Sequence, residues 1–294
     1  MPETKTIDIP QKAEIGLVLE GSGDDLGAVN SMGSLPLFDS YNRQTFYAEI
    51  FNKGSQAFNY QVKSNKPWVL ISESKGKIEK QKRVEIAIDW DKIPDGKQYA
   101  EITVKQQKGR SLKFAVQTIK YDEKHKKQVK GFIERNGFIA IDADNYCKAH
   151  ESDGFRWQVL PDHGHTGSSV MALPVTRAVE KPVATSPHLE YRFFLQDMPK
   201  DGKLSVNFYV SPTLNFLQKG GLKFAVSIDD QEPVIINIHQ GTEVPDWKYP
   251  NWWNTAVSEN TIKKASDHVI KEPGQHVLRY WLLDPGIVLQ RILI

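Results

Sequence analysis

Pro273-Gly-Gln-His-Val-Leu-Arg-Tyr-Trp-Leu-Leu-Asp-Pro-Gly-Ile-Val-Leu-Gln-Arg-Ile-Leu-Ile294 contains two runs rich in β-branched and aromatic residues, 276–283 and 287–294. They flank Asp284-Pro-Gly286, which is typical of a turn that either forms a hairpin or passes the chain to another sheet. In the second run, apolar residues occupy both alternating faces and leave few positions for solvent. We therefore expect a final strand covered on both sides, by its own sandwich and by a candidate neighbouring domain.

Short alternating runs of the same kind continue through the rest of the sequence. About seven lie between residues 13 and 120, with turns such as Pro94-Asp-Gly96 and no helical period, and they predict an immunoglobulin-like sandwich. Eight or more strands follow after residue 131, which fits a jelly roll. The predicted fold class is thus all-β with two β-sandwich domains, 1–120 with an extended N-terminal segment and 131–294.

The segment between these domains is the strongest charge run in the chain, Lys120-Tyr-Asp-Glu-Lys-His-Lys-Lys-Gln-Val-Lys130. A phosphate-binding patch is one interpretation of such a run. We favour a solvated linker at 121–130, because the run is short and includes two acids.

Composition excludes several classes of function. The 38 basic and 36 acidic residues give a net charge of +2 spread along the chain, so we expect no nucleic-acid partner. No apolar stretch approaches a membrane span, and no signal peptide is recognisable. The single Cys147 has no partner for a disulfide or a metal knuckle, and we expect it to be a small buried apolar residue.

Two pairs of residues have the spacing of metal ligands. Asp142 and Asp144 lie two apart on a predicted strand, so they predict either a calcium site completed by carbonyls of a distant loop or an ordinary acidic pair on an edge strand. His163 and His165 also lie two apart, in a glycine-rich loop. A metal pair needs a third ligand, which the sequence does not identify, so we favour hydrogen-bonding histidines.

Aromatic residues gather in the loop Val244-Pro-Asp-Trp-Lys-Tyr-Pro-Asn-Trp-Trp-Asn254. Sugars bind to aromatic faces, and nearby amides and charges bind their hydroxyl and carboxylate groups. Trp247, Tyr249 and Trp252 are therefore the candidate ligand-binding residues. The same residues would equally well cap the end of a sheet or form a domain contact, which is the interpretation that we favour for Trp253.

No catalytic signature accompanies these candidates. Glycoside hydrolysis usually needs two carboxylates at a fixed separation across a cleft, and nothing among the 36 acids marks such a pair. A nucleophile elbow, a P-loop, a dinucleotide fingerprint and a zinc-protease helix are also missing.

Several segments together resemble the C-terminal region of the α-glucuronidases of glycoside hydrolase family 115, which remove (4-O-methyl)glucuronic acid from xylan. They run in the expected order through almost the whole chain: Ile15-Gly-Leu-Val-Leu-Glu-Gly-Ser22, Leu35-Pro-Leu-Phe-Asp-Ser-Tyr-Asn-Arg-Gln44, Ile50-Phe-Asn-Lys-Gly54, Ser211-Pro-Thr-Leu-Asn-Phe216, Trp253-Asn-Thr-Ala-Val257, Pro273-Gly-Gln-His276 and Asp284-Pro-Gly-Ile-Val-Leu-Gln290.

The resemblance implies that the catalytic acids lie in upstream domains that this chain lacks, so no catalytic residue can be assigned here. It implies accessory sandwiches that brace a catalytic body, with the upstream catalytic domains of the same polypeptide and a homodimer as partners. It also implies xylan-type polysaccharide as a ligand and an extracellular or periplasmic location.

Three hypotheses follow for the function. The first is a non-catalytic accessory region of a xylan α-glucuronidase, favoured by the absence of any cluster of reactive groups. The second is a carbohydrate-binding module that uses the Trp247 loop and Asp142 with Asp144. The third, a free-standing glycoside hydrolase, is least favoured because the loops of a closed jelly roll would have to supply the whole site.

Overall fold

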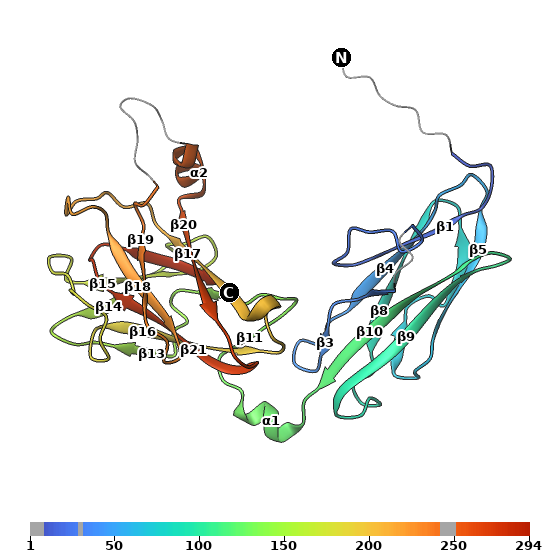
Figure 1. Ribbon diagram of the computed structural model, residues 1–294, viewed down its shortest axis with the longest axis horizontal. Coiled ribbons are helices and arrows are strands. Elements are labelled where there is room, and N and C mark those ends of the chain that lie inside the picture. Colours follow the sequence, from blue (N-terminus) through green and yellow to red (C-terminus); the bar gives the residue numbers. More distant parts are fainter. Residues whose placement is uncertain (1–8, 29–31, 242–250) are drawn as a thin grey trace, which may run out of the picture. The chain divides into compact units, whose positions relative to one another are not determined.

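The computed structural model describes residues 9–28, 32–241 and 251–294. The chain separates into two compact units, residues 1–128 and 129–294. Strands dominate both units (Figure 1), so the predicted all-β fold class is confirmed. No helix in the described ranges has the length and apolar character needed to cross a membrane.

The strands and the helix of the first unit are β1 (Ile15–Leu19), β2 (Gly33–Ser34), β3 (Phe38–Asp39), β4 (Phe46–Asn52), β5 (Phe58–Ser64), β6 (Val69–Ile71), β7 (Lys75–Ile78), β8 (Gln81–Ile88), β9 (Gly96–Gln106), β10 (Ser111–Lys120) and α1 (Glu123–Gln128).

Two sheets form the sandwich of the first unit. One has the order β1-β4-β8-β6, and the other has the order β2-β10-β9-β5-β7, with β3 also paired to β10. The pairs are antiparallel except where β2 and β3 run parallel to β10. This arrangement of four strands against a larger second sheet is immunoglobulin-like, as the spacing of the strands predicted.

Alternation explains why these segments are strands. In β4, Phe46, Ala48 and Ile50 are buried while the residues between them are partly exposed. Strand β8 repeats the pattern with Val84 and Ile86. Because successive side chains on a strand point to opposite faces, one face of each sheet supplies the core and the other meets solvent.

A buried aspartate organises the connection between β3 and β4. The Asp39 carboxylate, which is fully buried, accepts hydrogen bonds from the backbone N–H groups of Tyr41 and Asn42 at 2.9 and 2.7 Å. It also accepts bonds from the side chains of Asn42 and Gln44 at 2.9 and 2.6 Å. The Asp39 to Gln44 part of the family-like segment at residues 35–44 is therefore a self-bracing turn.

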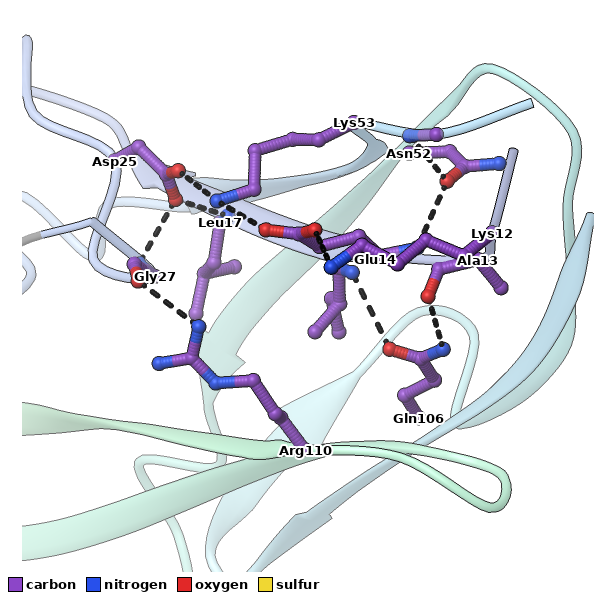
Figure 2. A network of polar contacts seen from close by, with 12 residues as sticks. Lys12, Ala13, Glu14, Leu17, Asp25, Gly27, Asn52, Lys53, Gln106 and Arg110 are labelled. Carbon is purple, nitrogen blue, oxygen red and sulfur yellow. Dashed lines mark hydrogen bonds and ion pairs between the residues drawn. The ribbon is translucent and has the colours of Figure 1, made fainter. Parts of the chain in front are cut away.

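A second network ties β1 to the end of β4 (Figure 2). Lys53 Nζ lies 2.9 Å from Asp25 Oδ2 and 3.5 Å from Glu14 Oε1. Asp25 Oδ1 in turn accepts the backbone N–H groups of Leu17 and Gly27 at 3.0 and 2.8 Å. Although burial of Asp25 acts in the opposite direction, these bonds hold its pKa below the ordinary value.

The predicted linker contains a helix. Helix α1 begins after Asp122, whose carboxylate accepts the N–H of His125 at 2.6 Å and thereby caps the helix. Glu123 lies in the first turn and basic residues lie in the last, which complements the helix dipole. Local capping thus makes a six-residue helix in the segment that we expected to be a solvated linker.

The elements of the second unit are β11 (Phe132–Ile133), β12 (Ala140–Asp142), β13 (Lys148–His150), β14 (Arg156–Leu160), β15 (Ser169–Leu173), β16 (His188–Leu195), η1 (Lys200–Gly202), β17 (Lys203–Val210), β18 (Lys223–Ile228), β19 (Val234–Asn237), α2 (Asn251–Glu259), β20 (Ile262–Val269), β21 (Gly274–Leu282) and β22 (Val288–Leu293).

These strands also form a sandwich. One sheet has the order β11-β16-β21-β18-β19 with β13 on β16, and the other has the order β14-β15-β22-β17-β20 with β12 on β22. The chain crosses repeatedly between the sheets, from β16 to β17, on to β18, and again from β20 to β21 and β22. Such crossing is characteristic of a jelly roll and agrees with the prediction. The core lies between the sheets and includes Tyr191, Phe193, Phe208 and Phe224.

The turn Asp284-Pro-Gly286 passes the chain from one sheet to the other, because β21 and β22 belong to different sheets. Of the two predicted alternatives, the sheet-switching turn is therefore confirmed. Lys223 N donates to Asp284 Oδ2 at 2.7 Å, and Asp284 N donates to Lys223 O at 2.8 Å, which fixes the turn to the start of β18. Gly286 has a φ of 81°, and a side chain here would meet the ring of Phe216.

Strand β22 carries a β-bulge at Gln290. Arg291 is opposite Tyr209 of β17 and Leu289 is opposite Val210, so no residue of β17 lies opposite Gln290. Leu289 and Gln290 are consecutive and both buried, at 0% and 3% exposure. The bulge shifts the alternation by one residue, so that Leu289 and Ile292 both belong to the core. Val288 and Leu293 on the other face are only partly buried, so the expected cover on both sides is not seen in this unit.

One expectation about the second unit is wrong. Cys147 is exposed, with its thiol 3.2 Å from the carbonyl oxygen of Glu190, and is not part of the core. It lies just before the short edge strand β13, where one face of the backbone is open to solvent.

Candidate functional site

A pocket of about 460 Å³ lies over the outer face of the sheet that contains β16 and β21. We call it the histidine–tryptophan pocket, and its central residues are His150, His188, Glu190, Arg279 and Trp281. Leu189 and Tyr191 of β16 belong to the core, so the alternating residues His188 and Glu190 face outward into the pocket.

Three rings pack against one another in this pocket, the first two stacked and the third tilted. The ring centroids of His150 and His188 are 4.5 Å apart with an interplanar angle of 15°, and those of His188 and Trp281 are 4.3 Å apart. The Trp281 indole N–H donates to Ser227 Oγ at 3.1 Å. Only 3% of His188 and 6% of Trp281 are exposed, so their ring faces are not available for stacking against a ligand.

Burial also decides the charge of the histidine. It lowers the pKa of His188, although a hydrogen bond to the carbonyl of Ser186 and the nearby Glu190 oppose the effect. His188 Nε2 lies 3.7 Å from Glu190 Oε1. His188 is therefore mainly a neutral packing ring at physiological pH.

The exposed part of the pocket is charged. Arg279 Nε lies 3.5 Å from Glu190 Oε1, and Arg279 Nη1 lies 3.8 Å from Asp230 Oδ1 and donates to the carbonyl oxygen of Asp229. The neighbouring Asp229 Oδ2 lies 2.8 Å from His276 Nδ1. Arg279 is thus matched by carboxylates, while the lining as a whole is acidic, with Glu190, Asp229, Asp230 and Glu232 against this one arginine.

The pKa of Asp229 is shifted in the direction opposite to that of a general acid in glycoside hydrolysis. A general acid needs a carboxyl with a raised pKa. Burial of Asp229 would raise its pKa, but the hydrogen bonds from His276 and Val277 outweigh that effect and hold it below the ordinary value. Throughout the described ranges, each carboxyl whose pKa clearly departs from its ordinary value departs downward: Glu14, Asp25, Glu73, Asp89, Glu123 and Asp229.

The structure places the predicted calcium pair next to an arginine. Asp142 on β12 is directly opposite Arg291 of β22, and Asp142 Oδ1 lies 3.2 Å from Arg291 Nε. The same oxygen accepts a hydrogen bond from Thr166 Oγ1 at 2.6 Å. Asp144 accepts a long 3.4 Å bond from the amide of Asn145. Within the described residues no three His, Cys, Asp or Glu side chains converge to hold a metal ion, and calcium at Asp142 and Asp144 stays a prediction.

The predicted aromatic ligand platform lies largely outside the described residues, which do not include Trp247 and Tyr249. The backbone of Trp252 belongs to α2, a helix that the sequence analysis missed because the segment resembles an aromatic loop. Trp253 on the same helix is 43% exposed. The part played by Trp247, Tyr249 and Trp252 stays a prediction.

The two histidines of the glycine-rich loop have separate hydrogen-bond partners. His163 Nδ1 lies 2.9 Å from Ser169 Oγ, whereas His165 Nε2 donates to the carbonyl oxygen of Glu259. The favoured interpretation of hydrogen-bonding loop histidines is therefore confirmed.

Polar residues of the family-like segments are used as internal braces. Gln290 Nε2 donates to Ser211 Oγ at 3.0 Å and to the carbonyl oxygen of Asn260 at 2.8 Å. Gln275 Nε2 donates to the carbonyl oxygens of Lys130 and Phe193, at 2.8 and 2.9 Å. These side chains satisfy backbone and hydroxyl groups of their own unit and do not point to a ligand.

Sequence reasoning did not find the histidine–tryptophan pocket, because its residues come from strands that are distant in the sequence. One local signal was present. His188 and Glu190 interrupt the apolar run of β16 at positions two apart, which indicates a polar outer face on a strand that is otherwise apolar.

Comparison with known proteins gives one family match. The family model for the glycosyl hydrolase family 115 C-terminal domain matches residues 131–294, which is more than half of the chain. No curated protein matches the chain.

Two solved structures are also similar to the chain. A family 115 4-O-methyl-α-glucuronidase with specificity for decorated arabinogalactans shares 17% identity over 53% of this chain, with a TM-score of 0.37, and the match covers 17% of that enzyme. A carbohydrate-binding module from Clostridium stercorarium, in complex with cellobiose, shares 10% identity over 52% of this chain and 89% of its own, with a TM-score of 0.27.

The chain therefore spans about a sixth of the length of the family 115 enzyme that it matches. Its second unit coincides with the matched segment and forms a sandwich. Gln275 and Gln290, which belong to the family-like segments, are internal braces of this sandwich. On the strength of the match to residues 131–294, this chain belongs to glycoside hydrolase family 115 and contains the C-terminal domain of that glucuronidase family.

Proposed function

We propose that the chain is a non-catalytic accessory region of a xylan α-(4-O-methyl)glucuronidase. In this role the two β-sandwiches support a catalytic body located elsewhere in the polypeptide and contribute to its assembly, including a homodimer. The enzyme as a whole is exported to the extracellular or periplasmic space.

One observation carries this proposal. The polar residues of the family-like segments that a catalytic site would expose, such as Asp39 and Gln290, are buried and bonded within their own unit. A catalytic or binding side chain needs at least one polar atom free to meet its substrate. Side chains that are fully engaged inside the fold instead stabilise a rigid support.

The proposal predicts that the chain alone is inactive. Glucuronoxylan and its aldouronic oligosaccharides would be incubated with the purified chain, and released uronic acid would be measured by mass spectrometry. We expect the same products as in a buffer control, while a catalytically complete family 115 enzyme releases the acid under the same conditions. Release that is abolished by substitution of any carboxylate in this chain would contradict the proposal.

A specific observation favours carbohydrate binding as a second candidate function. A pocket of about 270 Å³ adjoins α2, the helix that follows the aromatic loop, and Lys263 and Lys264 line it. Lys264 Nζ donates to the carbonyl oxygen of Gln240 at 2.7 Å, and burial lowers the pKa of this lysine. Amines that line a pocket are suited to a sugar that bears a carboxylate.

Binding at this site would be tested by affinity electrophoresis in gels that contain glucuronoxylan or neutral xylan. We expect Trp247→Ala to restore the free mobility of the chain, because the substitution removes a stacking face. Tyr99→Ala is the matched control, because Tyr99 is an exposed aromatic residue. Trp68 of the first unit is buried, so Trp68→Phe would not be a suitable control. Equal mobility of the parent chain with and without xylan would rule out this second function.

A further inference from the structure

The outer face of the larger sheet in the first unit carries a groove of about 760 Å³. Four lysines line it, Lys75, Lys77, Lys105 and Lys108, together with amide side chains such as those of Asn59 and Gln61. No acidic residue belongs to this lining. We call this surface the lysine groove, and nothing in the accessory role proposed above makes use of it.

Strand register arranges the lining in rows. Gln61 of β5 is directly opposite both Lys75 of β7 and Lys105 of β9, so these three residues form one row across three strands. Neighbouring strands lie about 4.8 Å apart, which places the Cα atoms of the two lysines about 10 Å apart with an amide between them. Asn59 and Lys77 form a parallel row, in which the Asn59 amide donates to Gln107 Oε1 at 2.9 Å.

The positive charge of the groove is largely uncompensated. Among the described residues, Lys75, Lys105 and Lys108 make no ion pair, and Lys77 pairs at 3.0 Å only with the highly exposed Glu79. The nearby Glu73 is already engaged with Lys82 at 2.6 Å. Residues 1–128 contain 21 Lys and Arg against 17 Asp and Glu, so the surrounding unit reinforces the field of the groove.

The groove is held in shape by the interior network. Gln106 lies between Lys105 and Lys108 but points inward, with 6% of its surface exposed. Its Oε1 accepts the backbone N–H of Ile15 at 3.2 Å and its Nε2 donates to the carbonyl oxygen of Ala13 at 3.2 Å (Figure 2). The end of β9 is thus tied to β1, which limits movement of the lysines on either side.

These features point to one class of ligand. Alternating ammonium and amide groups complement a chain that bears carboxylates and hydroxyls at intervals along its length. Tyr60, the aromatic residue that lines the groove, is 97% buried and offers no face for the base stacking on which single-stranded nucleic acid binding relies. We propose that the lysine groove binds a linear polysaccharide that carries uronic acid carboxylates.

The choice of a polysaccharide as the occupant rests on the proposed accessory role in a glucuronidase. The groove lies in the first unit and is separate from α2 and its pocket in the second unit, so the two binding hypotheses predict different variants. The purified chain would be run at low ionic strength in native gels that contain polygalacturonate, glucuronoxylan or neutral xylan. Retardation would be measured for the parent chain and for each variant.

We expect the parent chain to be retarded by the two carboxylated polymers and not by neutral xylan. K75S/K105S should lower the affinity roughly tenfold, because each exposed lysine contributes a modest, salt-screened interaction. K75R/K105R keeps the charges and should retain binding. K124S/K127S removes the same charge from two exposed residues of α1 outside the groove, and should also retain binding.

Several outcomes would overturn the inference. One is an absence of retardation by any carboxylated polymer at low salt. Another is an equal loss of affinity in K75S/K105S and K124S/K127S, which would mean attraction by net charge alone. Stronger groove-dependent binding of single-stranded DNA than of polygalacturonate would assign the groove to a different polyanion. The accessory role fails on a separate result, release of uronic acid by the chain alone, so failure of one does not imply failure of the other.

Discussion

Gln290→Ala offers a direct test of the idea that the family-like residues are braces. The side chain leaves the β22 bulge, and Nε2 donates to Ser211 Oγ at 3.0 Å and to Asn260 O at 2.8 Å. A third contact, from Thr261 Oγ1, is 3.5 Å long and contributes little. Gln290 is 3% exposed and Ser211 is 7% exposed, so water cannot readily replace the lost partners.

The expected loss can be worked from these contacts. Two well-formed hydrogen bonds contribute about 1 kcal/mol each, and a buried Ser211 hydroxyl left without its partner costs roughly 1 kcal/mol more. We therefore expect the second unit to lose about 3 kcal/mol of unfolding free energy. For a unit of this size, that loss lowers Tm by about 6 to 12 °C.

Differential scanning calorimetry and urea denaturation would measure the effect, and the first unit provides an internal reference. Gln117→Ala removes an exposed glutamine from β10 and should change stability by less than about 0.5 kcal/mol. A double-mutant cycle with Ser211→Ala should give a coupling energy above about 0.5 kcal/mol. A shift in Tm as small as that of the control, or no coupling with Ser211, would refute the brace interpretation.

Three further predictions concern other contacts. Asp39→Ala should destabilise the first unit by about 3 kcal/mol, because several donors lose a buried acceptor. The urea midpoint of the first unit would measure this loss, and a change within error would contradict the role of Asp39 in the turn between β3 and β4. Gly54→Ala should destabilise the first unit by about 1 to 3 kcal/mol, measured by urea denaturation, because a Cβ would overlap the carbonyl oxygen of Lys12 and force that segment to shift; an unchanged urea midpoint would contradict this. The hydrogen bond to Asp229 raises the pKa of His276. The stability that protonated His276 gives to the folded state is therefore complete below about pH 6.5 and is lost as the pH rises through the higher folded-state pKa. The stability difference between the parent chain and His276→Gln should therefore shrink above about pH 6.5 in urea titrations, and a difference that grows with pH would contradict it.

The two units divide the chemistry of the chain in a consistent way. In the second unit, the histidine–tryptophan pocket has carboxylates in excess, and its one arginine, Arg279, is already matched by Glu190 and Asp230. In the first unit, the lysine groove leaves three lysines without a carboxylate partner among the described residues. For an anionic ligand the lysine groove is the better candidate, since its lysines gain a carboxylate partner only on binding.

The acidic pair Asp142 and Asp144 shows what local spacing leaves open. Asp142 and Asp144 have the period expected for ligands on one face of a strand. Their environment depends on β22, which brings Arg291 opposite Asp142 across a separation of 149 residues. The sequence spacing indicates which side chains share a face, but it does not indicate which charge will lie beside them.

The sequence by itself determined the all-β class, the immunoglobulin-like and jelly-roll sandwiches and the turn at Asp284-Pro-Gly286, because alternation of period two and turn chemistry are local properties. It also carried the family resemblance. Only the tertiary structure decided that this turn joins two sheets, that Gln290 turns inward at a bulge and that Lys75 and Lys105 share a row. Those features depend on strand register between distant segments, and a shift of one residue would send every side chain of a strand to the opposite face.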